Sequence, residues 1–191
     1  CIRDRPYPNI KKHLDKFQKV ITSFNKPYGL HRARDEYFFK GEKIIAARKC
    51  IQPTFTYTDF DCYVSATFYI IKTERVNPKY LTSLLNSKLI AFWLKNKGKM
   101  QGNNYQIDKE PLLALPLIDI PKDKQIPFIT LVDKILATKQ QNPQADTKDL
   151  EDQIDIMVYK LYELTYEEVE IIDPQIGKII SKEDYDKFEI K

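Results

Sequence analysis

The spacing of apolar residues changes near the middle of the chain, and this change limits the fold more than any other feature of the sequence. Residues 55–58 (FTYT) and 61–73 (DCYVSATFYIIKT) are dense in aromatic and β-branched side chains, which favour strands. After Asn77-Pro78, a typical helix start, apolar residues recur at steps of three and four. The sequence therefore predicts an α+β fold. The apolar stripe of the predicted helix consists of Leu81, Leu84, Leu85, Leu89, Phe92 and Trp93.

The last third of the chain is predicted to be helical. Apolar residues at helical spacing cover residues 123–140, and Thr147 is placed to cap a second helix. Short helices are predicted after Thr165, where Glu168 completes a capping box, and after Ser181. We therefore expect a basic α+β region with a mixed β-sheet and packed helices over residues 1–120, followed by an acidic helical hairpin and tail over residues 121–191.

The net charge of +4 is divided unevenly between the two halves of the chain. Residues 1–110 contain 21 Lys and Arg against 10 Asp and Glu, a net charge of +11. Residues 111–191 contain 10 Lys and Arg against 17 Asp and Glu, a net charge of −7. This asymmetry predicts that the first half meets a polyanion. The alternative is that the two halves attract each other across an internal interface.

The sequence lacks the residue patterns of catalytic and metal sites. Its two histidines, His13 and His31, have no second ligand at metal-binding spacing. Its five glycines form no phosphate-binding loop, and no nucleophile elbow is present. We therefore expect no catalytic residues, no metal and no cofactor in this segment.

Three cysteines at irregular spacing favour a reduced, cytoplasmic protein. The sequence has no signal peptide and no apolar run of about 18 residues, so we expect no membrane partner. The chain begins with Cys1 and not with methionine, which leads us to expect a piece of a longer polypeptide.

Two basic segments carry the candidate contacts to a nucleic acid. One surrounds the predicted strand KIIAARK, and the other is the polar loop 97–104 that follows the apolar helix. Arginine can bond the guanine edge, glutamine and asparagine can bond adenine, and lysine mostly contacts phosphates. The alternative is that the loop only joins the helix to a short strand around residues 105–107. The candidate DNA-binding residues are Arg32, Arg34, Lys43, Arg48, Lys49, Lys97, Lys99, Gln101, Asn103 and Asn104.

Several further positions carry expectations about packing. We expect Arg32, Arg34, Arg48, Lys99, Gln101 and Asn103 to lie on one face of the domain. Tyr105 is expected to pack against the protein and not to stack on a base. The expected core residues are Leu85, Trp93, Phe68 and Leu161.

The order of three motifs resembles the C-terminal specificity domain of TaqI-like and type IIG restriction–modification enzymes. The motifs are YLTSLLNSK at residues 80–88, LPL at 115–117 and DIMVYKLYELTYEE at 155–168. The upstream segment LHRARDEYFFKGEKIIAARKC resembles the basic strand segment of the same family. The likeness covers residues 28–172.

The resemblance implies that this chain is the DNA target-recognition part of a larger enzyme. The parent would be an adenine-specific DNA methyltransferase, with or without endonuclease activity, that uses S-adenosylmethionine and has Mg²⁺ as a further candidate cofactor. Its Asn-Pro-Pro-Tyr/Phe methyltransferase motif does not occur here. The implied partners are double-stranded DNA and the upstream methyltransferase or nuclease domains. The acidic helices would pack on the same domain or on the methyltransferase.

Three alternatives remain open at the level of the sequence. The chain could be a protein–protein interaction module of a multi-subunit enzyme without direct DNA contact, and salt-insensitive binding would distinguish this case. It could also bind RNA, although no RNP-like or Gly-x-x-Gly signature is present. The third alternative is one half of the specificity subunit of a multi-chain restriction enzyme.

Overall fold

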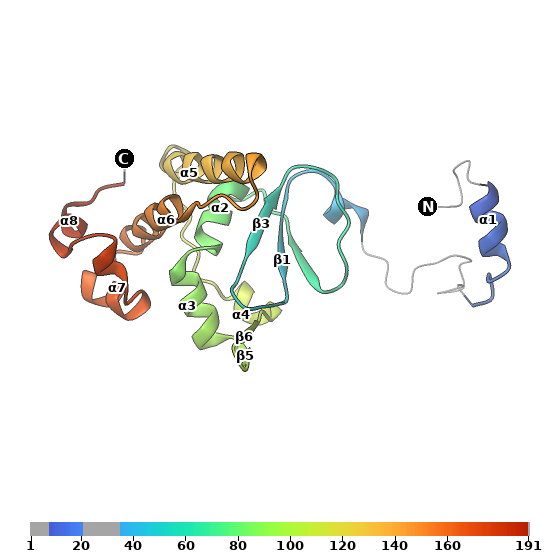
Figure 1. Ribbon diagram of the computed structural model, residues 1–191, viewed down its shortest axis with the longest axis horizontal. Helices are drawn as coiled ribbons and strands as arrows, with labels where there is room; N and C mark the ends of the chain where they lie inside the picture. Colours follow the sequence, from blue (N-terminus) through green and yellow to red (C-terminus); the bar gives the residue numbers. More distant parts are fainter. Residues whose placement is uncertain (1–7, 21–34, 191) are drawn as a thin grey trace. The chain divides into compact units, whose positions relative to one another are not determined.

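The computed structural model of the protein describes residues 8–20 and 35–190, which belong to two compact units. The first unit, Cys1–Tyr37, contains helix α1 (Pro8–Asp15), whose residues are all at least partly exposed. The second unit, Phe38–Lys191, contains helices and small sheets and is drawn in Figure 1. The predicted α+β class is confirmed.

The strands of the second unit form two small sheets, where we expected one mixed sheet. One has the strand order β3-β1-β4 and the other β2-β6-β5, and every described pair is antiparallel. The strand predicted over residues 61–73 is limited to β4, because β1 offers it only the four partners Ile44 to Ala47. The strands are β1 (Lys43–Ala47), β2 (Lys49–Cys50), β3 (Phe55–Thr58), β4 (Phe68–Ile71), β5 (Lys99–Gln101) and β6 (Asn104–Gln106).

The apolar helix predicted after Asn77 is divided into α2 (Pro78–Leu85) and α3 (Lys88–Lys97). The Asn77 side chain caps α2, as predicted, and the Ser87 hydroxyl caps α3 by accepting the N–H of Ile90. Between the two helices, Asn86 turns its side chain to the first residue of β3. The break between the helices thus coincides with a contact to a residue 31 positions away, which the apolar spacing does not reveal.

The Asn86 amide continues the hydrogen bonding of the sheet. Its Oδ1 accepts the Phe55 N–H at 2.9 Å, and its Nδ2 donates to the Phe55 carbonyl at 2.8 Å. The same Nδ2 also donates to the carbonyl of Thr82 in α2. One side chain thus joins the end of α2 to the start of β3.

We expect Asn86→Ala to lower the free energy of unfolding by about 2 kcal/mol, because two backbone groups at the start of β3 lose their partner. Urea denaturation followed by circular dichroism measures the change. Asn96→Ala is the matched control, since Asn96 is exposed and, among the residues that the structure describes, bonds only the Phe92 carbonyl of its own helix. Equal effects of the two substitutions would contradict the role given to Asn86.

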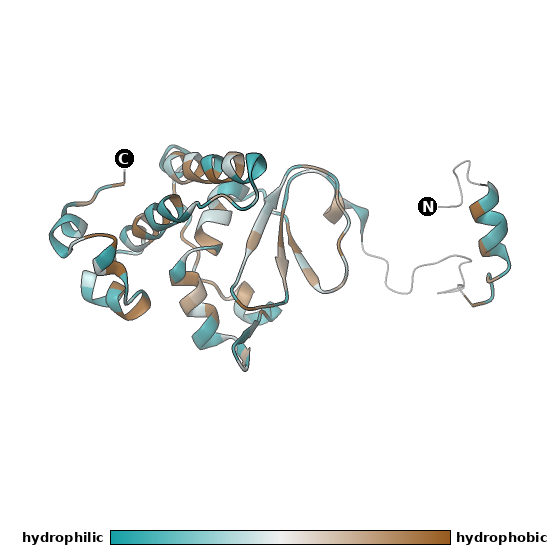
Figure 2. Ribbon diagram, in the orientation of Figure 1, coloured by the Kyte–Doolittle hydropathy of each residue, from teal (hydrophilic) through white to brown (hydrophobic). Residues whose placement is uncertain are grey.

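Three hydrophobic clusters lie in series across the second unit, and α2 belongs to two of them. Leu81 and Leu85 pack with the first sheet and α3, whereas Tyr80 and Leu84 pack with α5 (Lys122–Gln141) and α6 (Lys148–Leu161). The helix at the centre of the unit is therefore buried on both sides. Figure 2 shows both hydrophobic and hydrophilic residues along α3.

The expected core residues differ in how deeply they are buried. Leu85 is fully buried in the first cluster. Trp93 and Leu161 are half-buried and pack at the edges of the first and second clusters. Phe68 is half-buried in β4. The expectation therefore holds fully for Leu85 alone.

The helices after residue 120 pack on the rest of the second unit. Helix α5 packs along α2, and α6 and α7 each contact α3. The capping box of Thr165 and Glu168 is present as predicted, and Ser181 caps the last helix. Thr147 occupies the N-cap of α6, but its hydroxyl donates to the Glu151 carboxylate. The remaining elements are α4 (Lys109–Leu113), α5 (Lys122–Gln141), α6 (Lys148–Leu161), α7 (Tyr166–Ile172), α8 (Lys182–Lys187) and the 3₁₀ turns η2 (Glu36–Phe39) and η3 (Ile176–Lys178).

Candidate nucleic-acid interface

The segment 97–104, predicted to be a loop, is mostly a β-hairpin. Strands β5 and β6 pair from Lys99 opposite Gln106 to Gln101 opposite Asn104, with a two-residue turn between them. Gly102 takes the first turn position with a φ of +60°, the conformation that a type II′ hairpin requires there and glycine adopts without strain. Because β2 pairs with the other edge of β6, the hairpin is part of a three-stranded sheet.

One face of this sheet is apolar. Residues directly opposite each other share a face, so Cys50, Met100 and Tyr105 lie together. Cys50 and Tyr105 are half-buried and pack against the first hydrophobic cluster. Burial also raises the pKa of the Tyr105 hydroxyl. The position of Tyr105 is that of a packing residue.

The opposite face of the sheet carries only cationic and amide side chains. In Figure 2 most of the hairpin is coloured as hydrophilic. The face follows from the register, since Lys49 and Lys99 are both opposite Gln106, and Gln101 is opposite Asn104 two residues away. All except the half-buried Gln106 are exposed. We call this set the polar sheet face: Lys49, Lys99, Gln101, Asn104 and Gln106.

A chain of hydrogen bonds orders the amides on the polar sheet face. Gln101 Nε2 donates to Gln106 Oε1 at 2.6 Å, and Gln106 Nε2 donates to Asp108 Oδ1 at 3.0 Å. The other oxygen of Asp108 lies 3.5 Å from Lys99 Nζ. The hydrogen bond from Gln106, followed by the charges of Lys99 and Arg48, lowers the pKa of Asp108. This carboxylate is therefore ionised at neutral pH.

Arg48 stands at the junction of the two sheets. Its N–H donates to the Thr67 carbonyl beside β4, and its carbonyl accepts the N–H of Ile107 after β6. The exposed guanidinium lies 5.1 Å from the ring centroid of Tyr69, in cation–π contact. Arg48 is the single residue between β1 and β2, and it therefore places a cation next to the polar sheet face.

The other candidate residues occupy different positions. Lys97, at the end of α3, is exposed with its ammonium 5.9 Å from the Trp93 ring, and Asn103 is exposed in the hairpin turn. Lys43 is 1% exposed, and its Nζ donates to the carbonyls of Gly41 and Phe60, which removes it from the candidate DNA contacts. Arg32 and Arg34 lie outside the described residues.

Sequence reasoning missed Gln106 and Asp108. Gln106 falls in the short strand predicted around residues 105–107, and Asp108 is not among the predicted contacts. The dipeptide Gly102-Asn103 is a signal for a two-residue hairpin turn. A two-residue turn at Gly102-Asn103 places Gln106 opposite Lys99 and therefore on the same face.

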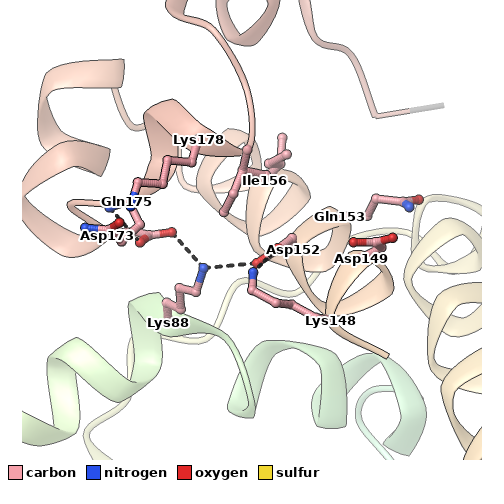
Figure 3. A pocket seen from close by; sticks show the side chains of 10 residues that line it. Lys88, Lys148, Asp149, Asp152, Gln153, Ile156, Asp173, Gln175 and Lys178 are labelled. Carbon is pink, nitrogen blue, oxygen red and sulfur yellow. Dashed lines mark hydrogen bonds and ion pairs between the residues drawn. The ribbon is translucent and has the colours of Figure 1, made fainter. Parts of the chain in front are cut away.

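A second cluster of charged residues surrounds Lys88, beside a cavity of about 790 Å³ (Figure 3). The Lys88 ammonium lies 2.7 Å from Asp173, 3.1 Å from Asp152 and 3.5 Å from Asp155. The Lys88 N–H also donates to Asp155 at 2.8 Å. We call these four residues the Lys88 cluster. Because it joins the start of α3 to α6 and to the residue after α7, we interpret it as a structural connection.

The described residues contain no group of three or more His, Cys, Asp or Glu side chains arranged to hold a metal ion. Within the same residues, every helix is too short or too polar to cross a membrane.

Part of the chain matches a known protein family. The sequence model of a protein family, described as the TaqI-like C-terminal specificity domain, matches residues 8–117, more than half of the 191-residue chain. The matched range includes the first sheet, α2, α3 and the whole hairpin. A search of curated proteins finds no match.

Proposed function

The chain belongs to the family of TaqI-like C-terminal specificity domains, and from this premise we propose that it reads a specific sequence in double-stranded DNA with the polar sheet face. Specificity domains of this family serve DNA recognition in restriction–modification enzymes. The observation that carries the proposal is the division of the sheet β2-β6-β5 into an apolar face against the core and an exposed face of lysines and amides.

The shape of the hairpin supports contact with a DNA groove. The major groove is about 12 Å wide and admits a two-stranded β-ribbon, which can present side chains to base edges. The tight turn at Gly102-Asn103 keeps the end of the ribbon narrow. Gln101 and Asn104, the last pair before the turn, are then the side chains that enter the groove most deeply.

The surrounding cations suit the DNA backbone. Lys49 and Lys99 lie at the base of the polar sheet face, with Arg48 beside them. Lysine and arginine contacts to phosphates fix the position of a protein on the duplex, and base contacts then select the sequence. The proposal therefore assigns the positioning of the hairpin to the cations and the reading of bases to the amides of Gln101 and Asn104.

We further propose that the chain serves as the recognition part of a DNA adenine methyltransferase, with or without nuclease activity. In that arrangement the catalytic groups, S-adenosylmethionine and any Mg²⁺ belong to other domains of the parent. A methyltransferase of this type rotates its target adenine out of the duplex, and a separate recognition domain supplies the register for that step.

The proposed function is tested by selection from a pool of duplexes with a random central segment, using the 191-residue chain as it stands. We expect successive rounds to enrich one common motif. Fluorescence anisotropy with the enriched duplex should then show binding that weakens as salt increases, with a slope of about −0.9 for each phosphate contact.

Two outcomes would contradict the proposal. A pool that enriches no motif would mean that the chain does not select DNA sequence. Binding that is unchanged by salt, or equal to binding of a single-stranded pool, would favour an interaction module that acts without duplex contact. Heparin serves as the competitor, because it offers anionic charge without base edges.

A further inference from the structure

The hydrogen-bond chain on the polar sheet face has only one possible direction. An ionised carboxylate can accept hydrogen bonds but cannot donate them, so Asp108 requires the NH₂ group of Gln106. The carbonyl Oε1 of Gln106 then points toward Gln101, and it requires a donor in turn. The negative charge of Asp108 thus sets the orientation of two successive amides.

The Gln101 amide keeps one donor and one acceptor for a ligand. One of its two Nε2 hydrogens is used by Gln106, which leaves the second hydrogen and the Oε1 atom. Neither has a partner within residues 8–20 and 35–190. Gln101 is exposed and stands next to the hairpin turn. It therefore presents a fixed pair of hydrogen-bonding groups at the end of the ribbon.

This pair matches one base edge in the major groove. Adenine presents the N6 donor beside the N7 acceptor, and a glutamine amide binds both at once. Guanine presents two acceptors, O6 and N7, so one of them would face the Gln101 oxygen. Thymine offers an acceptor and a methyl group, and cytosine offers a donor alone. A fixed amide with one free donor and one free acceptor thus favours adenine.

We infer that Gln101 selects an adenine at one position of the DNA site, and that Gln106 and Asp108 are positioning residues that hold its amide in the selective orientation. The inference rests on the proposed DNA-binding function and names the base that the polar sheet face recognises. Gln106 and Asp108 act through Gln101 and do not contact DNA themselves.

The first test compares duplexes that differ from the selected motif at one base pair. For the unchanged chain, replacing the adenine read by Gln101 should weaken binding about 5- to 150-fold, the equivalent of 1–3 kcal/mol. In Gln101→Ala this discrimination should be lost at that position and retained at the others. The change affects an exposed side chain next to the turn, so the fold is expected to persist.

The second test is Asp108→Asn, which keeps the shape of the side chain but allows it to donate as well as accept. Gln106 and Gln101 can then reverse their amides, and Gln101 can offer two donors to guanine. We expect total DNA affinity to rise, because a negative charge is removed, while the preference for adenine over guanine falls. Asp108 makes no capping hydrogen bond to α4, so the substitution spares that helix.

Glu110→Gln is the matched control for charge. Glu110 is exposed two residues further along, and it makes no contact with the amide chain. The Glu110→Gln substitution should raise the affinity for DNA without changing the base preference. The inference is wrong if Asp108→Asn behaves like this control, or if Gln101→Ala relaxes no position or relaxes one that is not adenine. In those cases the enriched motif itself still supports the proposed function, whereas a failure to enrich any motif removes both.

Discussion

Replacing Lys88 by methionine is expected to lower the free energy of unfolding by about 3 kcal/mol at pH 7.5. The substitution keeps most of the side-chain volume but leaves Asp152, Asp155 and Asp173 without their common cation. These side chains are only 11%, 7% and 6% exposed, so water solvates their carboxylates poorly. We take the lower end of the range for broken buried ion pairs, because the Lys88 side chain is 37% exposed and partly screened.

The loss in free energy of unfolding caused by Lys88→Met should depend on pH because of Asp155. Burial raises the pKa of Asp155 to about 6, although the N–H and the charge of Lys88 lower it. The unfolded chain titrates near 3.8, so the stability linked to this proton is complete below about pH 4 and is lost as the pH rises through 6. Removing Lys88 raises the pKa of Asp155 further. The Lys88→Met deficit should therefore be smaller by about 1 kcal/mol at pH 5 than at pH 7.5.

Urea denaturation at the two pH values measures both effects. Lys148→Met is the matched control, since Lys148 pairs with the same Asp152 but is 63% exposed and belongs to the same helix as its partner. Its effect should stay below about 1 kcal/mol. If the two substitutions cost the same, or if the Lys88→Met deficit does not change with pH, the Lys88 cluster is not the buried electrostatic connection described above.

The sequence Asn86-Ser87-Lys88 illustrates what could and could not be predicted. Apolar spacing placed a helix in this region, and the structure has two helices there. Each of the three polar residues makes a contact where one helix ends and the next begins: Asn86 bonds β3, Ser87 caps α3, and Lys88 contacts three aspartates. Spacing reports which residues are buried, but it does not report partners that lie 31 to 85 residues away along the chain.

The helical part of the fold was predicted best, because its signals are local. The capping box at Thr165 and Glu168 depends on residues three positions apart, and it is present. The sheets were predicted less well. Arg48 alone separates β1 from β2, and nothing in the sequence near it indicates that the chain passes there from one sheet to another.

The residue types of the candidate site could be predicted from the sequence, but their arrangement on one face of a sheet could not. The lysines, glutamine and asparagines of segment 97–104 suit DNA contact by their chemistry alone, and strand pairing then brings Lys49, 57 residues before Gln106, to the same face. Lys43 shows the limit of such reasoning. Its charge suggested a phosphate contact, but its strand position points the side chain inward, where two carbonyls bind it.

The double substitution Lys49→Ala/Lys99→Ala is expected to weaken binding to the selected duplex on the order of 100-fold at low salt, because each charge-assisted phosphate contact contributes about 1.5 kcal/mol. The two lysines flank Gln106 on the polar sheet face, so both are expected to meet the backbone of the same groove. With two contacts removed, the slope of binding against salt should decrease in magnitude by about 1.8. Fluorescence anisotropy at several salt concentrations measures both quantities.

The base preference should remain, because phosphates carry no sequence information. Lys124→Ala/Lys134→Ala removes two exposed lysines from α5 and changes the net charge equally. If the polar sheet face is the DNA contact, this control should leave the salt slope almost unchanged. Equal losses in the two double variants would mean that only the total charge of the protein attracts DNA. A loss of base preference in Lys49→Ala/Lys99→Ala would instead mean that these lysines contact bases, and the division between positioning cations and reading amides would then be wrong.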